Sequence, residues 1–215
     1  MFRVVIFTII HELSQKEHDY LLTFISNYKQ ERVKKFHFFR DARNCLLGDC
    51  LARIEICRAT GLSNNQLEFS TNAYGKPVLV NNPHIHFNIS HAGNYITCAI
   101  ASKPVGIDVE VVKHIDLKVA ERFFTSCERS YITNGNQIQR FFEVWTKKES
   151  QIKWEGKGLH KPLDSFSVFD FNEQKPLFYH KIFQNDEAIC HACSEHQAPP
   201  HVEFIDTPIF MRSIM

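Results

Sequence analysis

A chain of 215 residues, of which 44% are hydrophobic and 23% charged, has the composition of a globular protein with a sizeable core. A formal net charge of +1 creates no global field, so we expect neither nucleic acid nor a membrane surface as a partner. The sequence has no apolar stretch near the roughly 18 residues of a membrane span, and its seven scattered cysteines are typical of reduced thiols. We therefore expect a cytoplasmic protein.

The N-terminal segment is predicted to form a strand followed by a helix. The apolar run at 2–10 predicts the strand. Ser14 and Glu17 form a capping-box pattern, which predicts a helix from about residue 15 to residue 28.

A second helix and two strands complete the first half of the sequence. Asp41 is expected to cap the helix, because apolar residues then recur at helical spacing until Gly61, a typical helix terminator. The segment "PHIHFNISHAG" predicts a strand that turns at Gly93, and "NYITCAIA" predicts the next strand.

The turn at Ser102–Pro104 is the best boundary in the chain, dividing it into an α+β half at 1–102 and a second α+β half at 103–215. The second half begins with the strand "VGIDVEVV" and continues with a helix at "DLKVAERFF". A stronger helix is predicted from about Gln137 to Glu155, and the remaining tail is expected to be rich in strands.

Two acidic residues interrupt the apolar strand "VGIDVEVV". Asp108 and Glu110 are two residues apart, so their side chains point to the same face of the strand. Two neighbouring carboxylates repel each other unless a cation lies between them, and oxygen ligands without histidine suit Mg²⁺ better than zinc. The alternative is a strand end that emerges into water, and a lone D-x-E pattern does not exclude it.

The helix at Gln137–Glu155 adds a third carboxylate. Its apolar stripe runs along one face, and at 100° per residue Glu149 falls inside that stripe. Lys148 and Lys153 lie at the two margins of the stripe. A metal ion held by Glu149 together with the two strand acids is the simplest explanation of a glutamate in this position.

Two further clusters have both a functional and a structural interpretation. Six basic residues between Lys29 and Arg43 form either an anion site or a solvated helix face. The pair Cys190 and Cys193 has zinc-like spacing but no second pair, so zinc would need the nearby histidines His191, His196 and His201. The phosphate-binding patterns G-x-x-x-x-G-K-[ST] and G-x-G-x-x-G are absent, which argues against ordinary nucleoside triphosphate chemistry.

Five segments carry a resemblance to a known family. In order, they are "YGKP", "FNISHAG", "VGIDVE", "RFFTSCE" and "WTKKESQIKWEGKGLHKPLDSFSV". Together they resemble the 4′-phosphopantetheinyl transferases of the surfactin-synthetase-activating type, over at least Leu13 to Val168. The last part of the chain is matched less clearly.

The resemblance implies a reaction and a fold. The reaction is transfer of phosphopantetheine from coenzyme A to a serine hydroxyl of an apo peptidyl or acyl carrier protein, with release of adenosine 3′,5′-bisphosphate. The carriers would belong to peptide or polyketide synthases. The fold is α+β, with two similar halves related by pseudo-twofold symmetry, coenzyme A in the cleft between them, and a monomeric state.

The resemblance also assigns roles to residues. Asp108, Glu110 and Glu149 match the magnesium ligands of the family, and Glu149 is placed to help remove the serine proton, either directly or through a metal-bound water. Lys153 is expected on the phosphates, and the residues expected at the nucleotide end of coenzyme A are Lys76, Ser90 and His91.

The 3′-phosphate of coenzyme A is expected near Lys29, Arg32 and Arg43. Relatives tend to carry arginine four residues before the glycine of "LLG", whereas this chain has Asn44 there. Neighbouring positions on a helix point about 100° apart. Either Arg43 reaches round to the phosphate, or the phosphate is bound more weakly.

Two other functions share some of these features. A non-catalytic coenzyme A-binding relative would keep the binding segments without turnover, and a magnesium-dependent phosphohydrolase would share the three acids but not "GKP" and "ISHAG". The segment "ERFFTSCERSYI" provides either core packing or a docking surface for the carrier, with Phe124 and Tyr131 as the candidate contacts.

Overall fold

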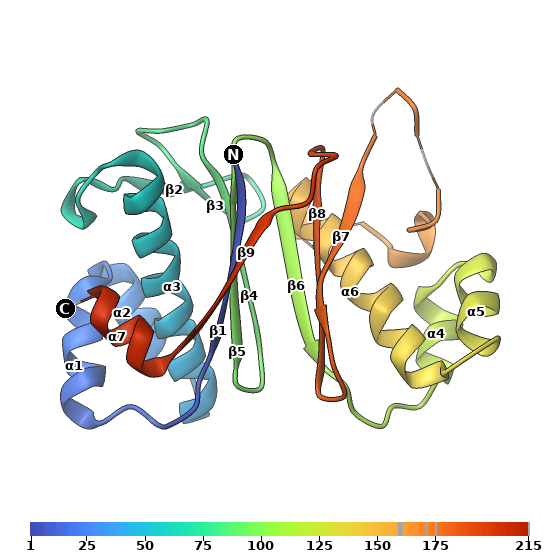
Figure 1. Cartoon of the computed structure of the whole chain (residues 1–215), viewed down its shortest axis with the longest axis horizontal. Helices are drawn as coiled ribbons and strands as arrows, with labels where there is room; N and C mark the ends of the chain where they lie inside the picture. The colour runs from blue at the N-terminus through green and yellow to red at the C-terminus, as the bar shows by residue number, and fades with distance from the viewer. Residues whose placement is uncertain (159–160, 171, 175, 215) are drawn as a thin grey trace.

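Two β-sheets occupy the centre of the molecule, and each is flanked by helices on its outer side (Figure 1). The computed structural model describes every residue except 159–160, 171, 175 and 215. The first sheet has the strand order β4 (His86–Ala92), β5 (Tyr95–Ala101), β1 (Phe2–Thr8) and β9 (His201–Asp206). The second has the order β6 (Val105–Val111), β8 (Ala188–Ser194) and β7 (Phe178–Gln184).

The two sheets share an apolar core. Valine, isoleucine and alanine side chains of β1 and β5 pack against those of β6 and β8, as Val4, Ile6, Ala99, Ile107 and Val109 illustrate. Alternate residues of β1 lie in two cores, with Val4 and Ile6 in this one and Val5 and Phe7 in the core under the first group of helices, as the period of two along a strand requires.

The helices form two groups. The first sheet is covered by α1 (Gln15–Phe24), α2 (Asn27–Lys34), α3 (Phe39–Thr60) and α7 (Thr207–Ile214). The second is covered by α4 (Lys118–Phe123), α5 (Ser126–Thr133) and α6 (Gln137–Glu155). Short elements complete the fold: η1 (Asn64–Gln66), the hairpin β2 (Phe69–Thr71) and β3 (Pro77–Leu79), and η3 (Leu163–Ser165). The α+β class predicted from the sequence is confirmed. Among the described helices, none combines the length and the apolar character needed to cross a bilayer.

Two helix predictions need correction. The helix predicted at 15–28 ends at Phe24, because the Ser26 side chain accepts a hydrogen bond from the Lys29 amide and begins α2. Asp41 is not a cap but lies in the first turn of α3, where its negative charge interacts favourably with the helix dipole. Gly61 ends α3 with φ of 73°, as predicted.

The C-terminal segment returns to the first sheet. Strand β9 pairs in parallel with β1, and the α7 residue Phe210 stacks on Phe7 at 4.6 Å. These elements therefore pack with the first half, although they lie inside the expected second half at 103–215. The division at residue 102 is therefore a division of the sequence, and β9 and α7 lie on the other side of it from the elements they pack against.

Candidate active site

Three side chains from three elements meet where the two sheets adjoin. Lys153 Nζ of α6 lies 2.6 Å from Asp108 Oδ1 of β6 and 2.9 Å from Ser90 Oγ of β4. Ser90 Oγ in turn donates to Asp108 Oδ1 at 3.0 Å. The Asp108 side chain is only 5% exposed. We call these three residues the acid–lysine cluster.

Glu110 and Glu149 extend the negative charge of this cluster. Burial, and then repulsion from Asp108, raise the pKa of Glu110 to about 7. The same two causes raise the pKa of Glu149, and Lys153 partly offsets them. Burial also raises the pKa of Asp108, against the opposing effect of Lys153. Three carboxylates therefore share one region of low solvation, where a cation would be stabilised.

A glycine permits the close approach of α6 to β6. A Cβ atom on Gly106 would lie 1.9 Å from the Ser150 carbonyl oxygen and 2.4 Å from the Trp154 amide nitrogen. Both are backbone atoms of α6, so only glycine fits without moving the helix. This contact brings Glu149 and Lys153 close to the strand that carries Asp108.

The carboxylates have the chemistry of a magnesium site, although they are not gathered into one. Asp108 Oδ2 is buried and has no hydrogen-bond partner among the described residues, which is compatible with a role as a metal ligand. Within the same residues, however, no three His, Cys, Asp or Glu side chains lie close enough together to hold a metal ion.

A cavity of about 900 Å³ lies in the first half, between the α2–α3 region, the β2–β3 hairpin and β4. Lys29 and Arg32 line it, together with the aromatic rings of Phe69 and Phe87. Lys29 is paired with Asp49 at 3.0 Å. Cations beside aromatic surfaces suit a phosphate attached to a planar base.

Two of the predicted coenzyme A contacts are engaged elsewhere. Arg43 is 1% exposed, with its guanidinium bonded to Glu12 and to the amide oxygen of Asn44, so it does not reach round into the cavity. Lys76 Nζ donates to the backbone carbonyls of Val105 and Lys153 at 3.0 and 2.5 Å. Neither side chain lines the cavity beside Lys29 and Arg32.

His91 lies beside the acid–lysine cluster at the solvent-exposed end of β4. Desolvation and the positive charge of Lys153 lower the pKa of His91. The structure thus brings Ser90 and Lys153 into contact with Asp108. It places Lys29 and Arg32 in a separate cavity.

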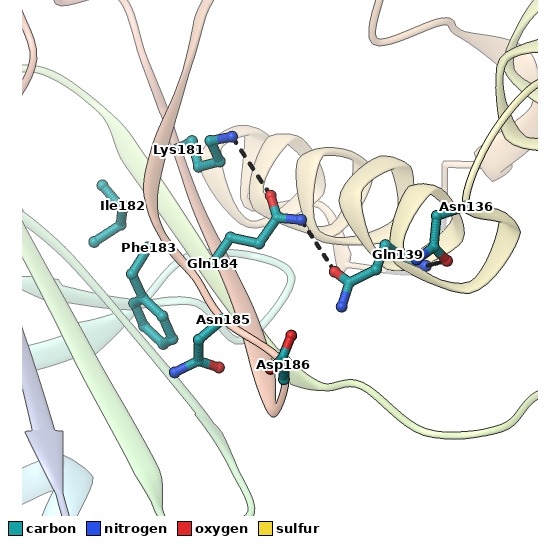
Figure 2. Close-up of a pocket in the computed structure, with 8 residues that line it drawn as sticks. All are labelled: Asn136, Gln139, Lys181, Ile182, Phe183, Gln184, Asn185 and Asp186. Carbon is teal, nitrogen blue, oxygen red and sulfur yellow. Dashed lines mark hydrogen bonds between the residues drawn. The ribbon is translucent and has the colours of Figure 1, made fainter.

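A second cavity, of about 610 Å³, lies at the β7–β8 turn (Figure 2). Its wall consists largely of amide side chains, and Gln184 bridges Lys181 and Gln139 across it. None of the acid–lysine residues lines this cavity, so it is separate from the candidate active site.

The comparisons with known proteins cover both halves of the chain. A model described as "4′-phosphopantetheinyl transferase, N-terminal" matches residues 12–104, and one described as "4′-phosphopantetheinyl transferase superfamily" matches residues 104–205. The 4′-phosphopantetheinyl transferase Sfp of Bacillus subtilis is 46% identical over 159 residues, which cover 73% of this chain and 71% of the relative. The chain belongs to the 4′-phosphopantetheinyl transferase superfamily.

More distant members of the superfamily are also similar. The 4′-phosphopantetheinyl transferase gsp of Aneurinibacillus migulanus is 37% identical over 79% of this chain and 71% of its own length. The human L-aminoadipate-semialdehyde dehydrogenase-phosphopantetheinyl transferase is 31% identical over 61% of this chain and 48% of its own length.

One buried ion pair in this superfamily member was not predicted from the sequence. Lys148 and Glu128 are both fully buried, 2.9 Å apart. Lys148 also donates to the carbonyls of Leu163 and Phe166, which fixes the segment after α6 against α5. The sequence pattern of Thr125 and Glu128 could have predicted a capping box at the start of α5. It could not have predicted that Glu128 is buried, because a capping glutamate is usually solvated.

The candidate docking contacts have different environments. Phe124 is 1% exposed and packs on Phe141, so of the two alternatives for this residue the structure supports core packing. The Tyr131 hydroxyl donates to Glu143, and its ring lies under the Arg140 guanidinium.

The zinc interpretation of Cys190 and Cys193 is wrong. The two thiols lie on β8 three residues apart, so they point to opposite faces of the strand. Both are buried, and His191 is bonded to Thr146 at 2.8 Å. No zinc-like group occurs in the part of the chain that the structure describes.

Proposed function

We propose that this chain transfers the 4′-phosphopantetheine group of coenzyme A to a serine hydroxyl of an apo carrier protein. The observation that carries the proposal is the acid–lysine cluster, with Glu110 and Glu149 beside it, in a member of this superfamily. A phosphoryl transfer needs a site that neutralises phosphate charge and accepts a proton, and this cluster has groups of both kinds.

Coenzyme A binding is supported by the cavity beside α2. Its volume of about 900 Å³ lies within the usual range for small-molecule sites. Lys29 and Arg32 would bind the 3′-phosphate there, and His91 and Ser90 would lie toward the pyrophosphate. Arg43 and Lys76 do not line this cavity, so we assign them no contact with the substrate.

In the reaction, the serine oxygen forms a bond to the phosphorus that carries the pantetheine arm. The bond from that phosphorus to the bridging oxygen of the pyrophosphate breaks, and adenosine 3′,5′-bisphosphate leaves with the electron pair. Glu149 accepts the serine proton, as a carboxylate beside the acid–lysine cluster can. The Lys153 ammonium stabilises the charge that develops on the phosphate oxygens.

Asp108, Glu110 and Glu149 would hold Mg²⁺, whose oxygen-ligand preference they match. When bound, this ion neutralises charge on the pyrophosphate oxygens. The acceptors would be carrier domains of peptide or polyketide synthases, and we propose that the enzyme acts as a monomer.

The test is the intact mass of a purified apo carrier protein after incubation with this chain, coenzyme A and Mg²⁺. The expected result is a mass gain of one phosphopantetheine group that EDTA abolishes. Bound coenzyme A without any gain on several carriers would favour a non-catalytic relative. Release of phosphopantetheine into water without an acceptor would favour a hydrolase.

The metal assignment has its own prediction. Asp108→Ala and Glu149→Ala should each reduce the transfer rate by about 100-fold or more, because each removes a carboxylate from the charge-neutralising site. Circular dichroism should show that both variants remain folded. Near-normal turnover of either folded variant would exclude that residue from the site.

A further inference from the structure

Strand β6 is an edge strand of the sheet β6-β8-β7. Its outer edge faces β4, which belongs to the other sheet and does not pair with it. Along this edge, three backbone groups of β6 are bonded to side chains from the first half. The Val105 carbonyl accepts from Lys76 Nζ at 3.0 Å, the Ile107 amide donates to Asn88 Oδ1 at 2.9 Å, and the Val109 amide donates to Ser90 Oγ at 3.3 Å.

The alternation of these contacts matches the geometry of a strand edge. Residues 105, 107 and 109 point their backbone groups to the same edge, while residues 108 and 110 carry the acids. On β4, Asn88 and Ser90 are likewise two residues apart. The side chains therefore replace the backbone ladder that a neighbouring strand would provide, and we call these three contacts the edge ladder.

We infer that Asn88 is a positioning residue that fixes Asp108 by holding the Ile107 amide, an inference that rests on the proposed function. Asn88 contacts the residue directly before Asp108, and Ser90 contacts the residue directly after it. Ser90 also donates to Asp108, so the ladder continues into the acid–lysine cluster. Loss of the Asn88 acceptor leaves the Ile107 amide unpaired and frees β6 to shift.

The experiment compares three variants with the wild type. Asn88→Leu keeps the side-chain size but removes the acceptor, and Asn88→Asp keeps an acceptor. Ser194→Ala is the control, because it removes a different, partly buried side-chain bond, from Ser194 Oγ to the Pro104 carbonyl at 3.0 Å, outside the acid–lysine cluster. For each variant we would measure kcat, KM for coenzyme A, Tm, and the hydrogen exchange of the Ile107 and Val109 amides.

Asn88→Leu should lower kcat by about tenfold or more while KM for coenzyme A stays within about twofold, because the defect lies in placement and not in binding. Exchange of both amides should accelerate. Asn88→Asp should recover most of kcat, and Ser194→Ala should lower Tm with kcat unchanged. If Asn88→Leu does not fold, the smaller Asn88→Ala takes its place.

If Asn88→Leu had a lower Tm than the wild type but the same kcat, the inference would be overturned, because the bond from the Ile107 amide to Asn88 would then be purely structural. Failure of the wild type to modify any carrier would overturn the proposed function instead. In that case the hydrogen-exchange rates still test whether Asn88 holds β6 in place. Faster exchange of both amides in Asn88→Leu than in the wild type supports this role, and unchanged exchange at Val109 overturns it.

Discussion

Asp108 lies almost wholly out of water, where an isolated carboxylate would cost several kcal/mol. Lys153 provides the opposite charge at 2.6 Å, and Ser90 provides a hydrogen bond. One Asp108 oxygen still has no partner among the described atoms. The buried Asp108 carboxylate is thus stabilised in the folded protein, and one of its oxygens can still accept a further ligand.

Lys153 and Lys147 provide a direct test of this arrangement. Lys153→Met should slow transfer by about 100-fold, because it removes the cation that faces Asp108 and the phosphates. Lys147→Met should change the rate by less than about threefold, because Lys147 is paired with Glu143 at 2.7 Å, apart from the acid–lysine cluster. Initial rates of carrier modification measure both effects. Similar losses in the two variants would contradict the orientation of α6.

Residue periodicity predicted part of the candidate site. Alternation along β6 placed Asp108 and Glu110 on one face, and helical spacing placed Glu149 inside the apolar stripe of α6. Arg43 and Lys76 were expected at coenzyme A from the family resemblance and not from periodicity. In the structure, Arg43 is bonded to Glu12 and Lys76 to the last turn of α6, and neither partner is near in sequence.

At the scale of the element, α6 provides both the candidate catalytic side chains and the support of the second half. Its bounds, Gln137–Glu155, were predicted correctly from the apolar stripe. Its buried surface is wider than that stripe, since Thr146, Lys148 and Ser150 are also buried. The bonds of Thr146 to His191 and of Lys148 to Glu128 are long-range contacts that periodicity does not encode.

The contact between α6 and β8 should make stability depend on pH. Burial lowers the pKa of His191 to about 3, whereas an unfolded histidine titrates near 6.5. Between these values the unfolded chain binds a proton that the folded chain does not, so the free energy of unfolding falls as the pH falls below about 6.5. Between pH 6.5 and 4.5 this contributes about 2–3 kcal/mol.

Urea unfolding at both pH values checks this, with His191→Gln as the reference. The variant lacks the titrating group, so its free energy of unfolding should depend less on pH by about that amount. Equal pH dependence in the two proteins would mean that His191 is not buried in the neutral form.

The close contact between α6 and β6 gives a second prediction for these elements. Gly106→Ala should destabilise the fold by about 3 kcal/mol or more, since the added methyl overlaps backbone atoms that no rotamer can move. Gly48→Ala is the control. Its methyl would meet side-chain atoms of Ile89 at 3.0 Å and Ile96 at 3.7 Å and no backbone atom within 4 Å among the described residues. Alanine also favours the helix by about 1 kcal/mol, so the net change should be small. Thermal unfolding distinguishes the two, and a stable Gly106→Ala variant would contradict the packing.

At the scale of the whole molecule, the C-terminal strand β9 lies beside the N-terminal strand β1. Arg3 of β1 bonds to His201 and Glu203 of β9 and to Glu55 of α3. The apolar pattern predicted a strand at β1 but could not show which distant strand lies beside it. Pairing partners depend on the packing of both sheets, and a parallel strand has no turn that fixes its register.

Phe210 tests whether this return stabilises the molecule. It is fully buried against Phe7, so Phe210→Ala should lower the free energy of unfolding by about 3–5 kcal/mol. Phe204→Ala on β9 removes the same number of atoms from a side chain that is 60% exposed, and should cost about 1 kcal/mol or less. Urea unfolding measures both. If the two variants were equally stable, α7 would not be docked on the first sheet in solution, and Phe7 would need another cover.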